Sequence, residues 1–113
     1  MKDERGRAGE ALAAAYLALV GMKVVERNLR IAGVEVDLVA ADRGVTVLVE
    51  VKARARSDFG GAALAVDERK RERLRRAASA MGRSARAVRI DVVAVELEAD
   101  GARLRHYRNA VEA

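Results

Sequence analysis

Acidic and basic side chains interrupt two apolar segments of the 113-residue sequence. Glu35 and Asp37 interrupt the first segment, and Glu50 and Lys52 interrupt the second. Both segments are short and rich in valine, so we expect strands, in which every second side chain points to the same face. Each charged pair should then share a face, and three carboxylates and one ammonium group would converge on one side of a hairpin. The opposite face of the first strand should carry Val34, Val36 and Leu38.

This charged cluster permits two interpretations. A structural salt bridge between Lys52 and either Glu50 or Asp37 is the simpler one. One ammonium group cannot neutralise three carboxylates, however, and burying unpaired charges in strands this apolar would cost several kcal/mol each. The surplus negative charge favours a divalent ion with oxygen ligands, Mg²⁺ or Mn²⁺. Zinc fits poorly, because the sequence has no cysteine and His106 is its only histidine.

The net charge of +5 is concentrated in one segment. Residues 66–86 contain eight basic and three acidic side chains, and the rest of the chain carries fourteen of each sign. A positive field on one element is what a protein that binds a phosphate backbone needs. A solvated, arginine-rich helix face would have the same composition. The residues expected to make general backbone contacts are Arg69, Arg73, Arg76 and Arg83.

Lys70 differs from these arginines in its place on the predicted helix. It precedes Leu74 by four residues and Met81 by eleven, which places it on the apolar stripe of the helix. Its side chain could therefore point toward the charged cluster and bind a phosphate. The alternative is a lysine that runs along the start of the helix and ends in solvent.

Other side chains restrict the function further. Tyr16, Phe59 and Tyr107 are the only aromatic residues, whereas proteins that stack the bases of a single strand need aromatic platforms. The sequence thus favours recognition of a duplex or branched backbone by shape and charge. Arg89 and Asp91 share a strand face and are candidates to pair with each other, and His106 is expected to be structural or exposed.

These groups require a particular order of helices and strands. Apolar spacing predicts a helix over residues 3–20, ended by Gly21. It also predicts a second helix that Asp67 or a neighbouring residue caps and that ends at Met81 before Gly82. The buried stripe of the first helix should be Leu12, Ala13, Tyr16, Leu17 and Val20, and that of the second Leu74, Ala77, Ala78 and Met81. Strands are predicted over residues 23–31, 34–41, 45–53, 88–98 and 103–111, with a loop at 57–61 and a turn at 99–102.

The connections between these elements predict the sheet. Short turns make the early strands antiparallel, while a helix between the third and fourth strands permits a parallel pair there. The expected fold is an α/β domain over residues 1–113, with a central mixed sheet flanked by helices.

The spacing of the charged residues resembles a known nuclease motif. Asp37, a gap of twelve residues and then Glu50-Val51-Lys52 is similar to P-D-(D/E)-x-K, although Val36 stands where the pattern has proline. From about Arg7 to Val111 the chain also resembles the bacterial YraN family. That resemblance is carried by residues 9–11, Tyr16, Leu17, Gly21, Asn28, Arg30, Gly33, residues 35–38, residues 50–52, Arg54, Phe59, Gly60, Lys70, Arg89, Asp91, Val92, Asn109 and Ala110.

The resemblance implies a fold and a set of roles. The fold would be the restriction-endonuclease-like core of helix, three strands, helix and strand, with an extra C-terminal strand, as in archaeal Holliday-junction resolvases. Asp37 and Glu50 would bind the metal with the Val51 carbonyl, and Lys52 would orient or deprotonate the attacking water or stabilise the pentacoordinate phosphate. Glu10 matches a helical acid that completes such sites, or is a surface glutamate. Glu35 is either a further ligand, or a residue that supports the ligands, or a surface charge. Arg54 is expected to contact nucleic acid.

The expected function is therefore metal-dependent hydrolysis of phosphodiesters, with DNA favoured over RNA and branched or recombination intermediates among the substrates. One alternative is a nucleic-acid-binding accessory protein with little catalysis, and another is a domain that docks onto a helicase or recombination partner. Cutting two strands as resolvases do would need a symmetric homodimer. A cytoplasmic protein without a secretory signal or membrane span is expected.

Overall fold

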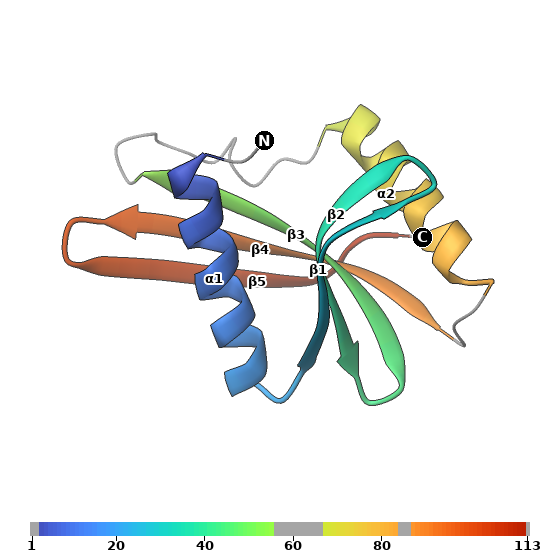
Figure 1. The fold of residues 1–113 in the computed structure, drawn as a ribbon, viewed down its shortest axis with the longest axis horizontal. Coiled ribbons are helices and arrows are strands. Elements are labelled where there is room, and N and C mark those ends of the chain that lie inside the picture. The colour runs from blue at the N-terminus through green and yellow to red at the C-terminus, as the bar shows by residue number, and fades with distance from the viewer. Residues whose placement is uncertain (1–2, 56–66, 84–86, 113) are drawn as a thin grey trace.

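The structure is a computed structural model that describes residues 3–55, 67–83 and 87–112 of the chain (Figure 1). Two helices and five strands follow one another in the expected order. They are α1 (Glu4–Leu19), β1 (Lys23–Ile31), β2 (Val34–Asp42), β3 (Val45–Ala55), α2 (Glu68–Met81), β4 (Val88–Glu98) and β5 (Gly101–Val111).

Both helices begin at the residues that the sequence indicated. The Asp3 carboxylate accepts a hydrogen bond from the Gly6 backbone N–H at 2.8 Å, and the Asp67 carboxylate accepts one from the Lys70 N–H at 2.8 Å. Each aspartate thereby satisfies an N–H that has no partner within the helix. The predicted turn at 99–102 was too long, because Glu98 already pairs with Gly101. The expected loop at 57–61 and Phe59 lie outside the described residues.

The five strands form one mixed sheet in the order β1-β2-β3-β4-β5. Neighbouring strands are antiparallel except β3 and β4, which are parallel and are connected through α2. The antiparallel start and the parallel pair were both predicted. The edge strands β1 and β5 expose charged side chains along their length, namely Lys23, Glu26, Arg27 and Arg30 on β1 and Arg103, Arg105 and Arg108 on β5.

The apolar core has two halves, one under each helix. Figure 1 shows α1 crossing the sheet, with α2 beside the β1–β2 hairpin. Ala13, Ala14 and Leu17 of α1 pack on the sheet residues Leu38, Ala40, Val47, Val49, Val93 and Val95. Leu74, Ala77 and Ala78 of α2 pack on the sheet residues Val34, Val36, Val39, Leu48, Ile90 and Val92.

The prediction of the buried residues of α1 was partly wrong. Leu12 and Val20 are 37% and 46% exposed, while Gly9 and Ala14 are buried. The helix lies against β3 through its small residues: a Cβ added to Gly9 would come within 2.5 Å of the Ala53 Cβ. Small side chains let the helix approach the strand closely, so the buried face is the one that carries them.

Strand β2 changes its relation to the sheet at Asp37. Val36 belongs to the core half under α2, and Leu38 belongs to the half under α1. The expectation that Val34, Val36 and Leu38 cover one face was therefore wrong. The pairing of β2 with β3 starts at Leu38, opposite Val49, so the part of β2 before Leu38 pairs only with β1. Opposite the break, Asn28 of β1 has a φ of +52°, a left-handed conformation that interrupts a regular strand.

A buried polar cluster joins β4, β5 and α1. The fully buried Asp91 carboxylate accepts hydrogen bonds from Arg89 at 2.8 and 3.1 Å, from the Asn109 backbone N–H at 2.9 Å and from His106 Nε2 at 2.7 Å. His106 Nδ1 lies 2.9 Å from the Tyr16 hydroxyl. Burial tends to raise the pKa of Asp91, but the hydrogen bonds from Arg89, Asn109 and His106 lower it overall. The predicted Arg89–Asp91 pair is confirmed, and His106 is structural.

Neither helix in the described part of the chain is both long and apolar enough to span a membrane.

Candidate active site

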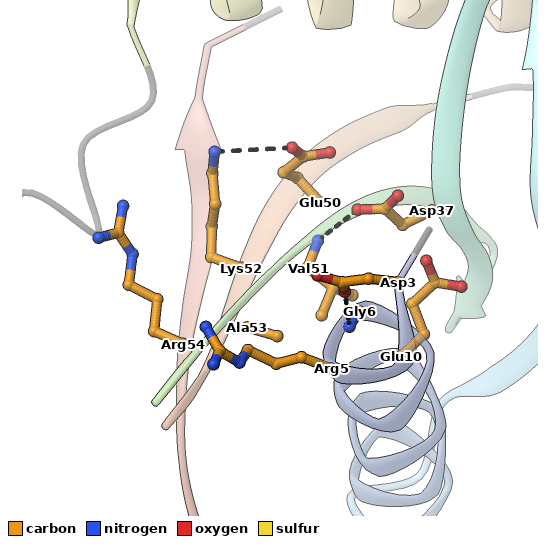
Figure 2. Close-up of a pocket in the computed structure, with 10 residues that line it drawn as sticks. All are labelled: Asp3, Arg5, Gly6, Glu10, Asp37, Glu50, Val51, Lys52, Ala53 and Arg54. Atoms are coloured by element: carbon orange, nitrogen blue, oxygen red, sulfur yellow. Dashed lines mark hydrogen bonds and ion pairs between the residues drawn. The ribbon is translucent and has the colours of Figure 1, made fainter. Parts of the chain in front are cut away.

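A cavity of about 640 Å³ opens where the start of α1 meets β2 and β3 (Figure 2). Such a volume is typical of pockets that bind a small ligand or part of a larger one. Four of the residues predicted to act in catalysis line it. The complete lining is Asp3, Arg5, Gly6, Glu10, Asp37, Glu50, Val51, Lys52, Ala53 and Arg54.

The cavity lies at the point where β2 leaves β3. The Val51 backbone N–H has no β2 partner there, since the pairing stops at Leu38 and Val49. The Asp37 carboxylate takes its place and accepts a hydrogen bond from this N–H at 2.8 Å (Figure 2). In a strand, the N–H and C=O of one residue face the same neighbour, so the Val51 carbonyl is directed to the same side as Asp37.

Glu50 is the most buried carboxylate of the cavity, with a side chain only 4% exposed. Its Oε2 lies 3.0 Å from the Lys70 Nζ and 3.9 Å from the Lys52 Nζ. Its Oε1 is buried and has no hydrogen-bond partner among the described residues. Burial, followed by repulsion from Asp37, raises the pKa of Glu50 to about 7, although Lys70 opposes the change.

Glu10 reaches the same cavity from α1. It is only 7% exposed, and in Figure 2 its side chain points toward Asp37. Its neighbour Gly9 is the residue that allows α1 to lie against Ala53, so the helix approach also positions Glu10. Glu10 was expected either to complete the site or to lie on the surface. In the structure its side chain is buried and lines the cavity.

The other side of the cavity is basic. Lys52 and Arg54 come from alternate positions of β3, and Arg5 extends from the first turn of α1 on the same side (Figure 2). Lys52 and Arg54 were among the predicted site residues, whereas Asp3, Arg5 and Gly6 were not. No strand or motif pattern marked these three, because the helix start reaches the cavity only through the tertiary contact of α1 with β3.

Some predicted site residues lie elsewhere. Glu35 is not part of the cavity lining: its side chain is 44% exposed, with an oxygen 4.0 Å from an Arg30 nitrogen. Lys70 points toward Glu50, as its place on the helix had suggested. The exposed side of α2 carries Arg69, Arg73 and Arg76, and Arg83 is exposed just after the helix.

The carboxylates of the cavity fit a hard divalent ion. Within the described residues, no three Asp, Glu, His or Cys side chains are gathered closely enough to enclose a metal by themselves. Mg²⁺ does not need such a cage, because it is often held by one or two carboxylates, with waters and substrate phosphates completing its shell. The partnerless buried oxygen of Glu50 is the kind of atom that a cation would satisfy.

Comparison with known proteins identifies relatives along almost the whole chain. The model of "Uncharacterised protein family UPF0102" matches residues 9–95. A UPF0102 protein from Halorhodospira halophila is 48% identical over 94 residues, which cover 82% of this chain and 78% of that protein. A UPF0102 protein from Beutenbergia cavernae is 46% identical over 112 residues, or 95% of each chain. One from Moorella thermoacetica is 46% identical over 101 residues, covering 86% of this chain and 84% of the relative.

Proposed function

The chain belongs to the UPF0102 family of YraN-like bacterial proteins, and we propose that it is a metal-dependent nuclease with a restriction-endonuclease-like core. One observation carries this proposal. Asp37, Glu50 and Lys52 meet around a single cavity at the break between β2 and β3, and the buried Glu50 Oε1 is left without a partner. The buried Asp91 carboxylate is satisfied by hydrogen bonds, whereas the buried Glu50 carboxylate keeps one oxygen without a partner among the described residues, and such a charge is costly in the absence of a ligand.

Asp37, Glu50 and the Val51 carbonyl would hold a Mg²⁺ or Mn²⁺ ion. Such an ion supplies a Lewis acid that offsets negative charge on a phosphate and makes a water molecule a better nucleophile. Glu10 completes the acidic side of the cavity. The proposed ligands do not include Glu35, because its exposed side chain lies outside the cavity lining.

The residues of the chain would then serve the hydrolysis as follows. As an ammonium, the Lys52 side chain orients the attacking water and offsets the charge of the pentacoordinate phosphate; as a neutral amine, it takes the proton of that water. A bond forms between the water oxygen and phosphorus, one ester P–O bond breaks, and the departing oxygen takes up a proton. Burial of Glu50 keeps bulk water from weakening these electrostatic interactions.

The basic residues would hold the substrate backbone. Arg54 borders the cavity itself, whereas Arg69, Arg73 and Arg76 recur at intervals of four and three residues on the exposed side of α2, which places them on one helix face. Such contacts recognise backbone charge and not sequence, and the proposed substrate is duplex or branched DNA in the cytoplasm. A homodimer, or docking onto a helicase or recombination partner, would supply the geometry for branched substrates.

Cleavage assays test this function. Labelled single-stranded, duplex, flapped and four-way-junction DNA, with RNA alongside, are incubated with Mg²⁺, Mn²⁺ or a chelator. We compare the wild type with Asp37→Asn, Lys52→Met and the control Glu35→Gln, which removes one negative charge as Asp37→Asn does. Metal-dependent cleavage by the wild type and the control, reduced at least a hundredfold in the other two, is expected. Cleavage that survives the chelator or Asp37→Asn contradicts the proposal. Salt-sensitive binding without any cleavage would identify a nucleic-acid-binding accessory protein.

A further inference from the structure

The two carboxylate oxygens of Glu50 have very different surroundings. Both nearby ammonium groups approach Oε2, Lys70 at 3.0 Å and Lys52 at 3.9 Å. Oε1 is buried and receives no hydrogen bond from any described residue. Only the Lys70 distance is short enough for a hydrogen bond, so Lys70 and not the motif lysine is the direct partner of Glu50.

The position of Lys70 in its helix is unfavourable for a lysine. It lies in the first turn of α2, three residues after the Asp67 cap, where the helix dipole favours negative side chains. A local preference that is violated beside a proposed active site usually serves the site. The attraction of Glu50 is the interaction that offsets this cost.

The Lys70 side chain is also within reach of a ligand. It is 35% exposed, although its ammonium contacts a glutamate that is 4% exposed. Arg69 precedes it, and Arg73 lies one turn further along the same exposed helix surface. A phosphate backbone held by these arginines would pass close to the solvent-accessible part of Lys70.

We propose that Lys70 is a positioning residue that couples metal binding to substrate binding. Its ammonium holds Glu50 while the site is empty of nucleic acid, and it moves to a phosphate oxygen of the bound strand, which leaves the Glu50 carboxylate to the divalent ion. This inference rests on the proposed nuclease function and gives Lys70 a role beside that of Lys52.

Coupling of this kind acts in both directions. A ligand that removes Lys70 from Glu50 strengthens metal binding, and a metal ion that displaces Lys70 strengthens the binding of phosphate by the same factor. A lysine that served only as a salt-bridge partner would change metal affinity through its charge, but its effect on DNA binding would not depend on whether a divalent ion is present.

The first experiment measures Mn²⁺ affinity of the protein alone, by titration at pH 8.5, where the Glu50 carboxylate is ionised. Lys70→Gln removes the competing cation, and we expect its Mn²⁺ dissociation constant to fall at least fivefold. Lys70→Arg keeps the charge and should stay within twofold of the wild type. Thermal melting of each variant verifies that it is folded.

The second experiment measures duplex DNA affinity with chelator and with Ca²⁺, which binds oxygen ligands as Mg²⁺ does; gel analysis verifies that the DNA stays intact. Lys70→Gln should weaken duplex binding severalfold with Ca²⁺. It should weaken binding little with chelator, because without a divalent ion the wild-type Lys70 stays paired with Glu50. The control Arg73→Gln should weaken binding equally in both conditions.

The outcomes separate the two proposals. Equal Mn²⁺ affinity in the wild type and Lys70→Gln, or weaker affinity in Lys70→Gln, overturns the role of Lys70 and leaves the nuclease proposal intact. If neither protein binds Mn²⁺, the metal-dependent function and the coupling both fail.

Discussion

The Asp37 carboxylate accepts a hydrogen bond from the Val51 backbone N–H, 2.8 Å away across the point where β2 leaves β3. One side chain thus replaces a missing strand neighbour and also takes part in the proposed metal site. The break in the sheet creates the cavity, and Asp37 makes that break tolerable for the backbone.

Substitution of Asp37 should separate these two roles. Asp37→Asn and Asp37→Ala both remove the charge, but only the asparagine keeps an oxygen that can accept from Val51. We expect Asp37→Ala to be less stable than Asp37→Asn by about 1–3 kcal/mol, the cost of a buried N–H without an acceptor. Urea denaturation measures the difference. Equal stability of the two variants would mean that the hydrogen bond contributes nothing.

Glu50 should make the protein less stable as the pH rises. Its pKa is raised from 4.5 to about 7 in the folded state, so the folded protein binds this proton more tightly than the unfolded chain. The stabilisation is complete below pH 4.5 and is lost as the pH rises through about 7. Relative to Glu50→Gln, the wild type should lose about 3 kcal/mol over this range.

Denaturation of the wild type, Glu50→Gln and Glu35→Gln between pH 4 and 9 tests this expectation. The exposed Glu35 serves as the control, and its variant should follow the wild-type curve. Mg²⁺ at pH 8 should raise the melting temperature of the wild type more than that of Glu50→Gln, because a bound ion stabilises the folded state. Parallel curves of stability against pH for all three proteins would show that folding does not raise the pKa of Glu50.

Most of the fold was predictable from local sequence signals. The two caps and the strand bounds follow from Asp3, Asp67 and the alternation of valine with polar residues, which depend only on neighbours in the chain. The change of face at Asp37 was not predictable, because it coincides with the end of the β3 pairing, which is a property of the whole sheet.

The same distinction applies to the site. Asp37, Glu50 and Lys52 were identifiable because charges in apolar strands are conspicuous. Arg5 is an ordinary charged residue at the start of a helix, and only the packing of α1 on β3 brings it to the cavity. Glu35 has a residue type and spacing like those of Asp37, and its two alternatives could not be separated from the sequence; in the structure its side chain is 44% exposed and lies outside the cavity lining.

Gly9 should be essential for the approach of α1 to β3. Alanine normally stabilises a helix interior by about 0.5–1 kcal/mol relative to glycine. Here the added Cβ would lie 2.5 Å from the Ala53 Cβ, so we expect Gly9→Ala to destabilise the protein by about 1–3 kcal/mol. Adding Ala53→Gly should recover part of the loss, and a double-mutant cycle measures this coupling. Additive effects of the two substitutions would contradict the contact.

Asp91 should contribute to stability over most of the pH range. Asp91→Asn weakens its charged hydrogen bonds and leaves Arg89 without its main partner, so we expect a loss of about 3 kcal/mol at pH 7. Because the folded pKa is lowered, this contribution is present above the unfolded value of 3.8 and is lost as the pH falls through the folded pKa. The difference in stability between the wild type and Asp91→Asn should be smaller at pH 3 than at pH 7; an equal or larger difference at pH 3 would contradict the lowered pKa.

The arginines of α2 should differ in their effect on DNA binding. Arg75 is engaged within the protein, by Glu68 at 3.0 Å and the Glu112 carbonyl at 3.1 Å, whereas Arg73 is exposed on the outer surface. Arg73→Gln should reduce the salt dependence of duplex binding by about 0.9 in log–log slope, the value of one phosphate contact. Arg75→Gln should leave the slope nearly unchanged. Identical slopes for the two variants would contradict a direct contact between Arg73 and the DNA backbone.

The charged edge strands determine how the protein behaves when it is crowded. An open strand edge is a template onto which another chain can add its own strand, and this is how fibres and amorphous precipitates begin. Exposed basic residues outnumber exposed acidic ones on both edge strands. Arg103, Arg105 and Arg108 lie on β5, where Arg103 pairs with Glu98 and Arg108 with Asp42, and Lys23, Arg27 and Arg30 lie on β1 beside Glu26. This charge opposes the edge-to-edge approach of two copies. The charged side chains thereby oppose aggregation through the strand edges. Neutralising them, with the core left intact, should increase edge-to-edge pairing and lower the solubility of the protein.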